Sequence, residues 1–311
     1  MIRMPGKSYD GPLPPLTETE AALRDALRQD VETLAGEIGE RNVFCYSKLV
    51  AAAEFIERAF ADARCTVRRE GFEAADQMCY NLEATITGVD QPDEIVVVGA
   101  HYDSVLGCPG ANDNGTGVAA MLALARAFSG KKTSKTLRFV AFVNEEPPFF
   151  QTNQMGSMVY AQGCRDRNEN VVGMLSLETI GYFRDEAGSQ HYPSPMGLFY
   201  PTTGNFIAFV GNRDSKKLVR EVVASFRRQV KFPSEGGALP NAVPGIDWSD
   251  HWGFWQMGYP ALMVTDTAPF RYPYYHTPQD TPDKVDYEPF ARLTAGLALV
   301  VKDLVGVERE T

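Results

Sequence analysis

The sequence predicts an α/β protein built around a mostly parallel β-sheet. The first observation is the run Ile-Val-Val-Val at residues 95–98, which is apolar, β-branched and bounded by Gly99, as expected of a strand buried on both faces. The second is that a Gly/Pro-rich loop follows this run and helical periodicity begins at Asn114. A chain of 311 residues, 44% of them hydrophobic, can bury a sizeable core, so one large domain is expected.

The amino-terminal part predicts a tail, two helices and three strands. Residues 1–16 are rich in proline and glycine, and we expect an extended tail before a single domain over 17–311. Thr17 and Glu20 match a capping box, which begins an amphipathic helix over 18–38. The periodicity then predicts a helix over about 46–63 and strands over 65–73, 81–88 and 94–100.

The alternation of strands and helices continues after the helix that begins at Asn114. The expected elements are strands over 136–144, 174–180, 206–210 and 261–265, a helix over 214–229, and a closing helix with Phe290, Leu293, Leu297, Val300 and Leu304 on its apolar side. Residues 231–247 are rich in glycine and proline and are expected to form a long loop of the kind that often borders a functional site.

Composition excludes several classes of protein. The formal net charge of −10 is spread without long like-charge blocks or a basic stripe, so nucleic acid is not an expected partner. No apolar run approaches the ~18 residues that cross a bilayer, so no membrane is expected either. Five widely spaced cysteines without a C-x-x-C pair indicate neither a zinc knuckle nor a disulfide framework. The absence of an apolar segment near Met1 favours a cytoplasmic location, or a secreted one if a leader has been removed.

Histidines and acids gather at the ends of the predicted strands. His101 and Asp103 lie two residues apart in an extended segment, so their side chains can face one spot. Such a pair alone is usually a core histidine bonded to a neighbour, but four more acids also fall at strand or loop ends, namely Asp113, Glu145, Glu146 and Glu178. Open α/β sheets bind ligands at that edge, and Zn²⁺ accepts nitrogen and oxygen ligands. The pattern therefore predicts a zinc site.

Glu145 and Glu146 are expected to have different roles, because consecutive residues in an extended chain project to opposite sides. One carboxylate can bind the metal while the other accepts a proton from water whose pKa the ion lowers towards ~7. The alternative is an ordinary charged loop before Pro147. Of the remaining histidines, His276 lies beside tyrosines and is a second candidate ligand, whereas His191 is expected in a surface loop.

Other catalytic templates fail. The segment from Gly115 to Ala120 imitates a dinucleotide-binding fingerprint, but about fourteen residues separate it from its strand, whereas the motif must follow its strand directly. The sequence contains no G-x-S-x-G, H-E-x-x-H or Walker A motif. The common serine hydrolase, zincin and nucleotide hydrolase interpretations therefore lose support.

Six motifs between His101 and Asp280 resemble in type and order those of the zinc-dependent aminopeptidase family, and the resemblance spans about residues 45–305. That family includes bacterial leucine aminopeptidases, glutamate carboxypeptidase II and the glutaminyl cyclases. The motifs are His101-Tyr-Asp103, Gly110-Ala-Asn-Asp113-Asn-Gly-Thr-Gly117, Asn144-Glu145-Glu146, Leu177-Glu178-Thr-Ile-Gly181, Ser249-Asp250-His251 and Tyr275-His276-Thr-Pro-Gln-Asp280. The resemblance implies a three-layer α/β/α sandwich in which a mixed, mostly parallel sheet carries two zinc ions at its carboxyl edge.

The resemblance also implies which residues bind the ions. Two sites share one bridging aspartate, with His101, Asp113 and Glu178 in one and Asp113, Glu146 and His276 in the other. Glu145 is then the general base that deprotonates the shared water and later protonates the leaving amine. Glu178 departs from the usual aspartate, and its extra methylene moves the carboxylate by about one bond length. Weaker occupancy of the Glu178 site is therefore a hypothesis.

Three further residues receive roles from the same resemblance. Tyr275 would hydrogen-bond the tetrahedral intermediate, although it could equally be a structural residue of an aromatic-rich loop. Asp103 would orient His101 through its second ring nitrogen. Asp250 would lie near the catalytic carboxylates, or alternatively cap the helix that follows it. The peptide bond after Asp113 is expected to be cis.

We therefore predict a zinc-dependent aminopeptidase that uses two zinc ions to hydrolyse the first peptide bond of substrates with a free amino terminus. A single-zinc glutaminyl cyclase is the alternative, because it carries similar motifs. A non-catalytic interaction module is a third reading, but such modules usually lack ligands, and none is missing here. A set of aromatic residues could line a substrate pocket, although core packing is the expected role for most of them: Phe149, Phe150, Trp252, Phe254 and Trp255. The preferred amino-terminal residue and the oligomeric state stay open.

Overall fold

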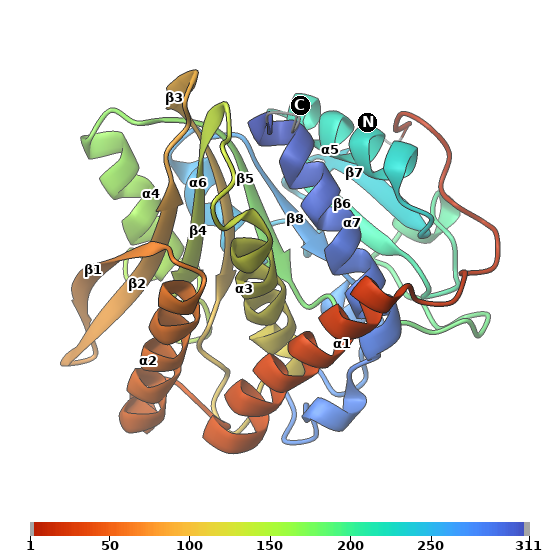
Figure 1. Cartoon of the computed structure of the whole chain (residues 1–311). Coiled ribbons are helices and arrows are strands. Elements are labelled where there is room, and N and C mark those ends of the chain that lie inside the picture. The colour runs from red at the N-terminus through yellow and green to blue at the C-terminus, as the bar shows by residue number, and fades with distance from the viewer. Residues whose placement is uncertain (1–2, 308–311) are drawn as a thin grey trace.

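The computed structural model describes residues 3–307 and shows one eight-stranded mixed sheet between two layers of helices (Figure 1). The strand order is β1-β2-β4-β3-β5-β8-β6-β7. The strands are β1 (Thr66–Ala74), β2 (Gln77–Ile86), β3 (Gln91–His101), β4 (Lys135–Phe142), β5 (Asn170–Glu178), β6 (Ile207–Asn212), β7 (Ser234–Leu239) and β8 (Ala261–Thr265). The predicted fold class is confirmed.

The central strands β4, β3, β5 and β8 are parallel, so their carboxyl ends meet at one edge of the sheet. The strands that flank this group are partly antiparallel: β2 pairs antiparallel with β4, and β6 pairs antiparallel with β8. The register places His101 beside Phe142 of β4, and Glu178 beside Thr265 of β8. The two candidate ligands that end β3 and β5 therefore lie at the same sheet edge.

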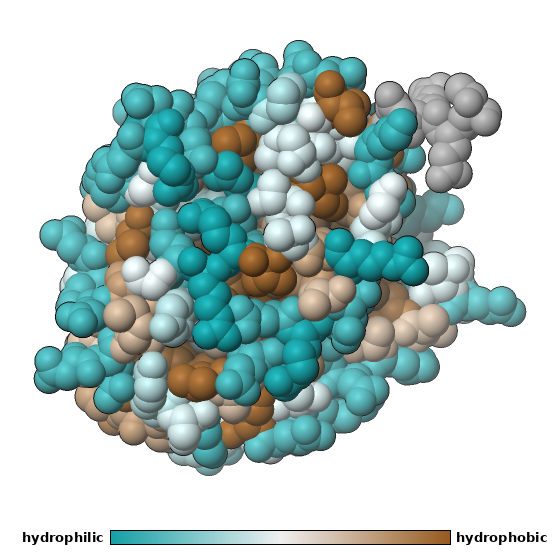
Figure 2. Space-filling model, turned by 60° about the vertical axis from the view of Figure 1, so that its left-hand side comes forward, coloured by the Kyte–Doolittle hydropathy of each residue, from teal (hydrophilic) through white to brown (hydrophobic). Residues whose placement is uncertain are grey.

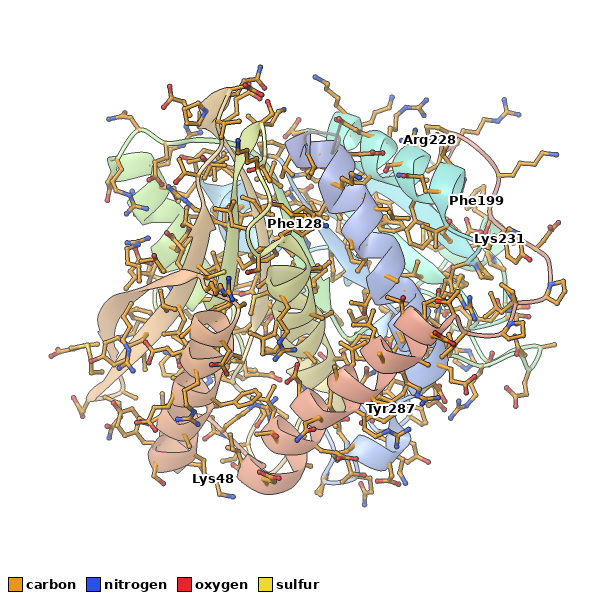
Figure 3. The ribbon with its side chains drawn as sticks, in the orientation of Figure 1. Lys48, Phe128, Phe199, Arg228, Lys231 and Tyr287 are labelled. Carbon is orange, nitrogen blue, oxygen red and sulfur yellow. The ribbon has the colours of Figure 1, made fainter. Side chains whose placement is uncertain are left out.

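Seven α-helices cover the two faces of the sheet. They are α1 (Glu18–Val31), α2 (Tyr46–Asp62), α3 (Gly117–Phe128), α4 (Gly156–Asp166), α5 (Lys216–Gln229), α6 (His251–Gln256) and α7 (Tyr287–Val305) among the described residues. Helices α1, α2, α3, α5 and α7 share one core, and α4 and α6 share the other. Figure 3 shows Tyr287 where α1 meets α7, and the guanidinium carbon of Arg28 lies 4.2 Å from the centre of its ring.

Strand β3 lies inside the sheet, and its side chains enter both cores. Val96 and Val98 pack beneath the larger helical layer, whereas Ile95 and Val97 pack with Phe254 of α6. Alternate residues of a strand point to opposite faces, so a strand covered on both sides must be apolar throughout. This confirms the sequence prediction of a doubly buried strand.

The predicted elements are present, with differences at their ends and two omissions. The capping box of α1 is confirmed: the Thr17 hydroxyl accepts the backbone N–H of Glu20, and the Glu20 carboxylate accepts that of Thr17. The expected helix over 18–38 continues past α1 as a π-helix, Glu32–Ile38. Helix α4 was not predicted. The expected loop over 231–247 contains β7, whose Ser-Glu-Gly-Gly-Ala-Leu sequence lacks β-branched residues.

Residues 3–16 form no helix or strand and lie along α5 and β7. Arg220 donates to the carbonyl of Arg3, and the backbone N–H of Ser234 donates to the hydroxyl of Ser8. Among the described residues, no helix is both long and apolar enough to span a bilayer. Figure 2 shows a face on which hydrophobic residues form small, separated patches among hydrophilic ones.

The close packing of α6 on α4 yields a stability prediction. A Cβ added at Gly253 would lie 2.7 Å from the backbone nitrogen of Met158, so one helix must move. We expect Gly253→Ala to lower the free energy of unfolding by about 1–3 kcal/mol, measured by urea denaturation. Gly36→Ala is the matched control, because an added Cβ there meets only a side-chain atom of Pro282 at 3.7 Å. An equal loss in both variants would contradict this account.

Candidate metal centre

Five side chains form two adjoining groups at the carboxyl edge of the sheet. In the first group, His101 Nε2 lies 3.3 Å from Asp113 Oδ1 and 3.3 Å from Glu178 Oε2. In the second, His276 Nε2 lies 3.1 Å from Asp113 Oδ2 and 3.3 Å from Glu146 Oε2. Within each group, one donor atom from each of the three residues lies within 4.8 Å of the others. Asp113 therefore belongs to both groups and turns one oxygen toward each.

The chemistry of these donors fits a divalent cation pair. His101 Nε2 and Glu146 Oε1 are buried and have no hydrogen-bond partner among the described residues. Burial and the neighbouring Asp113 raise the pKa of Glu146 to about 7. Burial alone would lower the pKa of His101, but the charges of Glu178 and Glu145 outweigh it and raise that pKa. Buried carboxylates that repel one another around unpartnered nitrogen and oxygen atoms are stabilised by a cation, and Zn²⁺ accepts both donor types.

Glu145 lies beside the two groups without belonging to either. Its side chain is buried, and Oε2 lies 3.8 Å from His101 Nε2. Burial raises its pKa well above the usual range, against the opposing charge of His101. Glu146 turns instead toward His276. The two adjacent acids thus diverge, as the alternation of an extended chain predicts.

Asp103 orients this pair of acids, a role that the sequence did not predict. Its two carboxylate oxygens accept the backbone N–H groups of Glu145 and Glu146, both at 3.1 Å. The predicted contact with His101 is present in a different form. The ring Nδ1 lies 3.2 Å from the Asp103 backbone carbonyl, to which it can donate, and 3.5 Å from the carboxylate. This arrangement leaves Nε2 free to face the donor group.

The backbone around Asp113 is held by residues far away in the sequence. Asp280 accepts the backbone N–H groups of Asn112 at 2.8 Å and Asp113 at 3.0 Å, and the hydroxyl of Tyr272 at 2.6 Å. The peptide bond from Asp113 to Asn114 is cis, as expected. Asp280 ends the last of the six motifs but was given no role, since two of its partners are backbone groups of residues more than 160 positions away along the chain.

The carboxylates of Glu178 and Asp250 differ in their hydrogen-bond partners. The Ser249 hydroxyl donates to Glu178 Oε2 at 2.7 Å, and Ser176 lies 2.7 Å from the same hydroxyl. Asp250 is completely buried, and burial raises its pKa to about 8. It directly precedes α6 at the N-cap position, but its side chain makes no capping hydrogen bond, so the capping alternative is wrong. The charge of His101 opposes this shift of the Asp250 pKa, and the charge of Glu178 adds to it.

Tyr275 stacks on the ring of His276, with centroids 3.8 Å apart and planes 15° apart. It also lines a cavity of about 110 Å³ that adjoins Glu178. The histidine that was predicted to lie in a surface loop, His191, is exposed. His251 is buried against the carbonyl of Ile246 and faces neither donor group.

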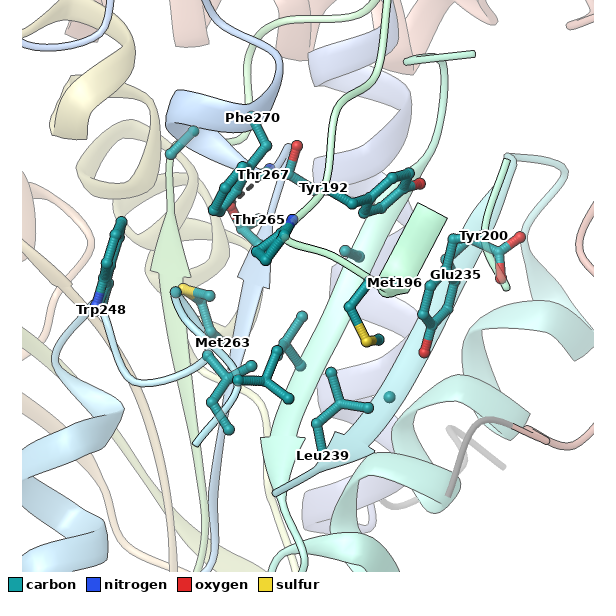
Figure 4. A pocket seen from close by; sticks show the side chains of 18 of the residues that line it. Tyr192, Met196, Tyr200, Glu235, Leu239, Trp248, Met263, Thr265, Thr267 and Phe270 are labelled. Carbon is teal, nitrogen blue, oxygen red and sulfur yellow. Dashed lines mark hydrogen bonds between the residues drawn. The ribbon is translucent and has the colours of Figure 1, made fainter. Parts of the chain in front are cut away.

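The cavity is mainly apolar and lies over β6, β7 and β8. Segments 190–200 and 243–248 close it, and the side chains drawn in Figure 4 include Met196, Leu239, Met263 and Phe270. The aromatic residues suggested by the sequence do not line it. Phe254, for example, packs in the core against Phe142 and Tyr160. The true lining escaped prediction because it comes from segments without regular periodicity.

Comparison with known proteins places this geometry in a family. The model of peptidase family M28 matches residues 81–301. The uncharacterized protein YfbL of Escherichia coli is 35% identical over 282 residues, which are 88% of this chain and 86% of YfbL. Probable zinc metalloproteases of several fungi also match, and the chain spans between 21% and 46% of their lengths.

Solved structures share the fold at lower identity. BSAP, a zinc aminopeptidase from Bacillus subtilis, has a TM-score of 0.74 at 15% identity and covers 93% of this chain and 96% of its own. The Fimbriiglobus ruber glutaminyl cyclase has a TM-score of 0.65 at 21% identity and covers 94% and 97%. Together with the two donor groups at the sheet edge, the family match confirms the resemblance predicted from the six motifs: this chain belongs to peptidase family M28 and is a zinc-dependent metallopeptidase.

Proposed function

We propose that this protein is an aminopeptidase that uses two zinc ions and Glu145 to hydrolyse the first peptide bond of a substrate. The observation that carries the proposal is the position of Asp113, whose two oxygens face two separate histidines, with Glu145 left outside both groups. A shared carboxylate between two donor groups suits a pair of ions. A free acid beside that pair suits proton transfer.

The two groups divide the ligands between the ions. His101, Asp113 and Glu178 would hold one zinc ion, and Asp113, Glu146 and His276 would hold the other. When bound, such a pair polarises the scissile carbonyl and lowers the pKa of the attacking water. Asp103 keeps Glu145 and Glu146 in their separate directions through the two backbone hydrogen bonds.

Glu145 performs the proton transfers in this proposal. It accepts a proton from the attacking water and returns it to the nitrogen of the leaving amine, so no proton is lost overall. The buried surroundings that raise the pKa of Glu145 favour its acceptance of the proton from water. Tyr275, stacked on His276 at the cavity wall, would donate its hydroxyl to the oxygen of the tetrahedral intermediate.

The cavity supports a preference for peptides with a large apolar first residue. Its lining is mostly apolar, it adjoins Glu178 and Tyr275, and its volume is about 110 Å³. A dry cavity of ~150 Å³ accommodates benzene, so this one is of the size of a branched or ring side chain. An anionic side chain would lose its hydration there and would lie near the carboxylates of Glu178 and Glu235.

Glutaminyl cyclisation is the alternative, favoured by the structural likeness to the Fimbriiglobus ruber enzyme. It requires one zinc ion per chain, and it would release one molecule of ammonia from each amino-terminal glutaminyl peptide. A non-catalytic module has less support, because all five donor positions hold side chains that can bind a metal. Our prediction of a cytoplasmic location remains a separate proposal.

Loss of the proposed base is the most direct test of hydrolysis. We expect Glu145→Gln to lower kcat for a leucyl chromogenic amide by about 10²–10⁴-fold, because the amide cannot accept the water proton. The zinc content of the variant should stay unchanged, since Glu145 belongs to neither donor group. Glu94→Gln is the matched control, because Glu94 pairs with Lys135 at the opposite end of β3. Wild-type activity in Glu145→Gln would refute the mechanism.

Metal titration tests the two sites separately. Chelation should abolish hydrolysis, zinc should restore it, and the zinc-free protein should bind two ions with unequal affinity. We expect Glu178→Gln to remove the weaker site and Glu146→Gln the tighter one, whereas the surface variant His191→Gln should keep both. Two equal, tight sites would contradict the hypothesis of weaker binding at Glu178, and one site with cyclase activity would support the alternative.

The substrate preference is testable by filling the cavity. Ala208 lies on β6 and lines it, so Ala208→Leu should remove room for a large side chain. We expect the ratio of kcat/KM for phenylalanyl over alanyl amide to fall about 10-fold or more, since a misfit of a methylene or more costs 1–3 kcal/mol in such pockets. The alanyl amide is the internal control. An unchanged ratio would show that the first side chain binds elsewhere.

A further inference from the structure

A buried arginine lies directly beneath the loop over residues 102–110. Arg41 is completely buried, and its guanidinium donates to three carbonyl oxygens of that loop. The Nε–H group reaches Tyr102 at 2.6 Å, Nη1 reaches Pro109 at 2.5 Å and Nη2 reaches Gly110 at 2.8 Å. One planar group therefore ties both ends of the loop together, which a flexible point charge cannot do.

This loop joins two of the three residues of the first donor group, His101 and Asp113. Tyr102 directly follows His101, and Gly110 precedes Asp113 by three residues. Gly110 has a φ of 67°, and a Cβ there would lie 2.6 Å from the Asp113 carbonyl and 3.2 Å from Arg41 Nη2. The turn that delivers Asp113 thus rests on the guanidinium with no room between them.

The backbone of Arg41 is attached to the same loop. Its N–H donates to the Ser104 hydroxyl at 3.0 Å, and its carbonyl accepts the Ser104 N–H at 2.9 Å. The remaining contacts of the guanidinium are the carbonyls of Gly39 and Leu34. Arg41 therefore joins the segment before α2 to the loop at several points.

Arg41 also carries a charge that its hydrogen-bond partners do not neutralise. Every acceptor is a neutral carbonyl, and no ion pair among the described residues includes it. Burial lowers the pKa of Arg41 to about 10, and the charges that oppose this shift belong to Asp103, Asp280, Asp113 and Glu146. The group is still cationic at neutral pH, and electrostatic interactions reach further in a buried environment than in water.

We propose that Arg41 is a positioning residue of the metal centre, which fixes loop 102–110 so that His101 and Asp113 face the same ion and offsets repulsion among the carboxylates. The inference rests on the proposed zinc site and assigns it a supporting residue. Residue 41 lies outside the stretch that the family model matches, 81–301. It contacts no side chain of either donor group, so it acts through the backbone and through its charge.

The test compares zinc affinity in Arg41→Met, Arg41→Lys and wild type by competition with a chromogenic chelator. We expect Arg41→Met to bind zinc about 10–100-fold more weakly, the usual effect of removing a group that supports a ligand. The zinc affinity of Arg41→Lys should lie between those of Arg41→Met and the wild type, because an ammonium keeps the charge but cannot reach both Tyr102 and Gly110. At saturating zinc, KM for the leucyl amide should match that of the wild type, since Arg41 contacts no substrate.

Arg292→Met is the matched control, because Arg292 is also buried and donates to a backbone carbonyl, that of Pro14. Thermal unfolding of the zinc-free proteins reports general loss of stability. Equal zinc affinity in wild type and a folded Arg41→Met would overturn the inference, as would an equal loss in Arg292→Met. If Arg41→Met does not fold, wild-type affinity in Arg41→Lys overturns it. If the wild type binds no zinc, the proposed function itself is wrong. This outcome differs from a failure of the Arg41 inference, in which the wild type still binds zinc.

Discussion

The position of one buried carboxylate, that of Asp113, governs the rest of the site. Its two oxygens face two imidazoles that come from different parts of the chain, and a carboxylate can do this only if its backbone is held firmly. Asp280 holds the backbone from one side, and Arg41 holds the preceding turn from the other. Both contacts bind main-chain atoms, so the carboxylate itself stays free for a cation, which offsets the cost of burying it.

Hydrogen bonds to main-chain atoms also separate the roles of the two adjacent glutamates. The alternation of an extended chain turns Glu145 and Glu146 apart, and the two oxygens of Asp103 fix that difference through consecutive N–H groups. One acid joins a donor group while the other remains beside it. The apolar cavity next to Glu178 then favours one orientation of a bound substrate, because an apolar substrate side chain can enter the cavity without a polar partner.

Most of the fold followed from sequence patterns, but some elements did not. Doubly buried strands such as β3 and amphipathic helices such as α7 have strong periodicity, and their positions were predicted to within a few residues. Strand β7 has two consecutive glycines and no β-branched residue, and α4 contains glycine at both its start and its eighth position. Tertiary packing overrode weak local preference in both cases.

The sequence by itself determined the fold class, the family and the chemical types of the donors, because polar residues that end parallel strands must meet at one edge. His101 and Glu178 are of this kind. Only the tertiary structure decided that Asp103 holds two glutamate N–H groups, that Arg41 lies under the loop, and which segments enclose the cavity. These features depend on contacts between residues far apart along the chain, and neither periodicity nor motif spacing reports such distances.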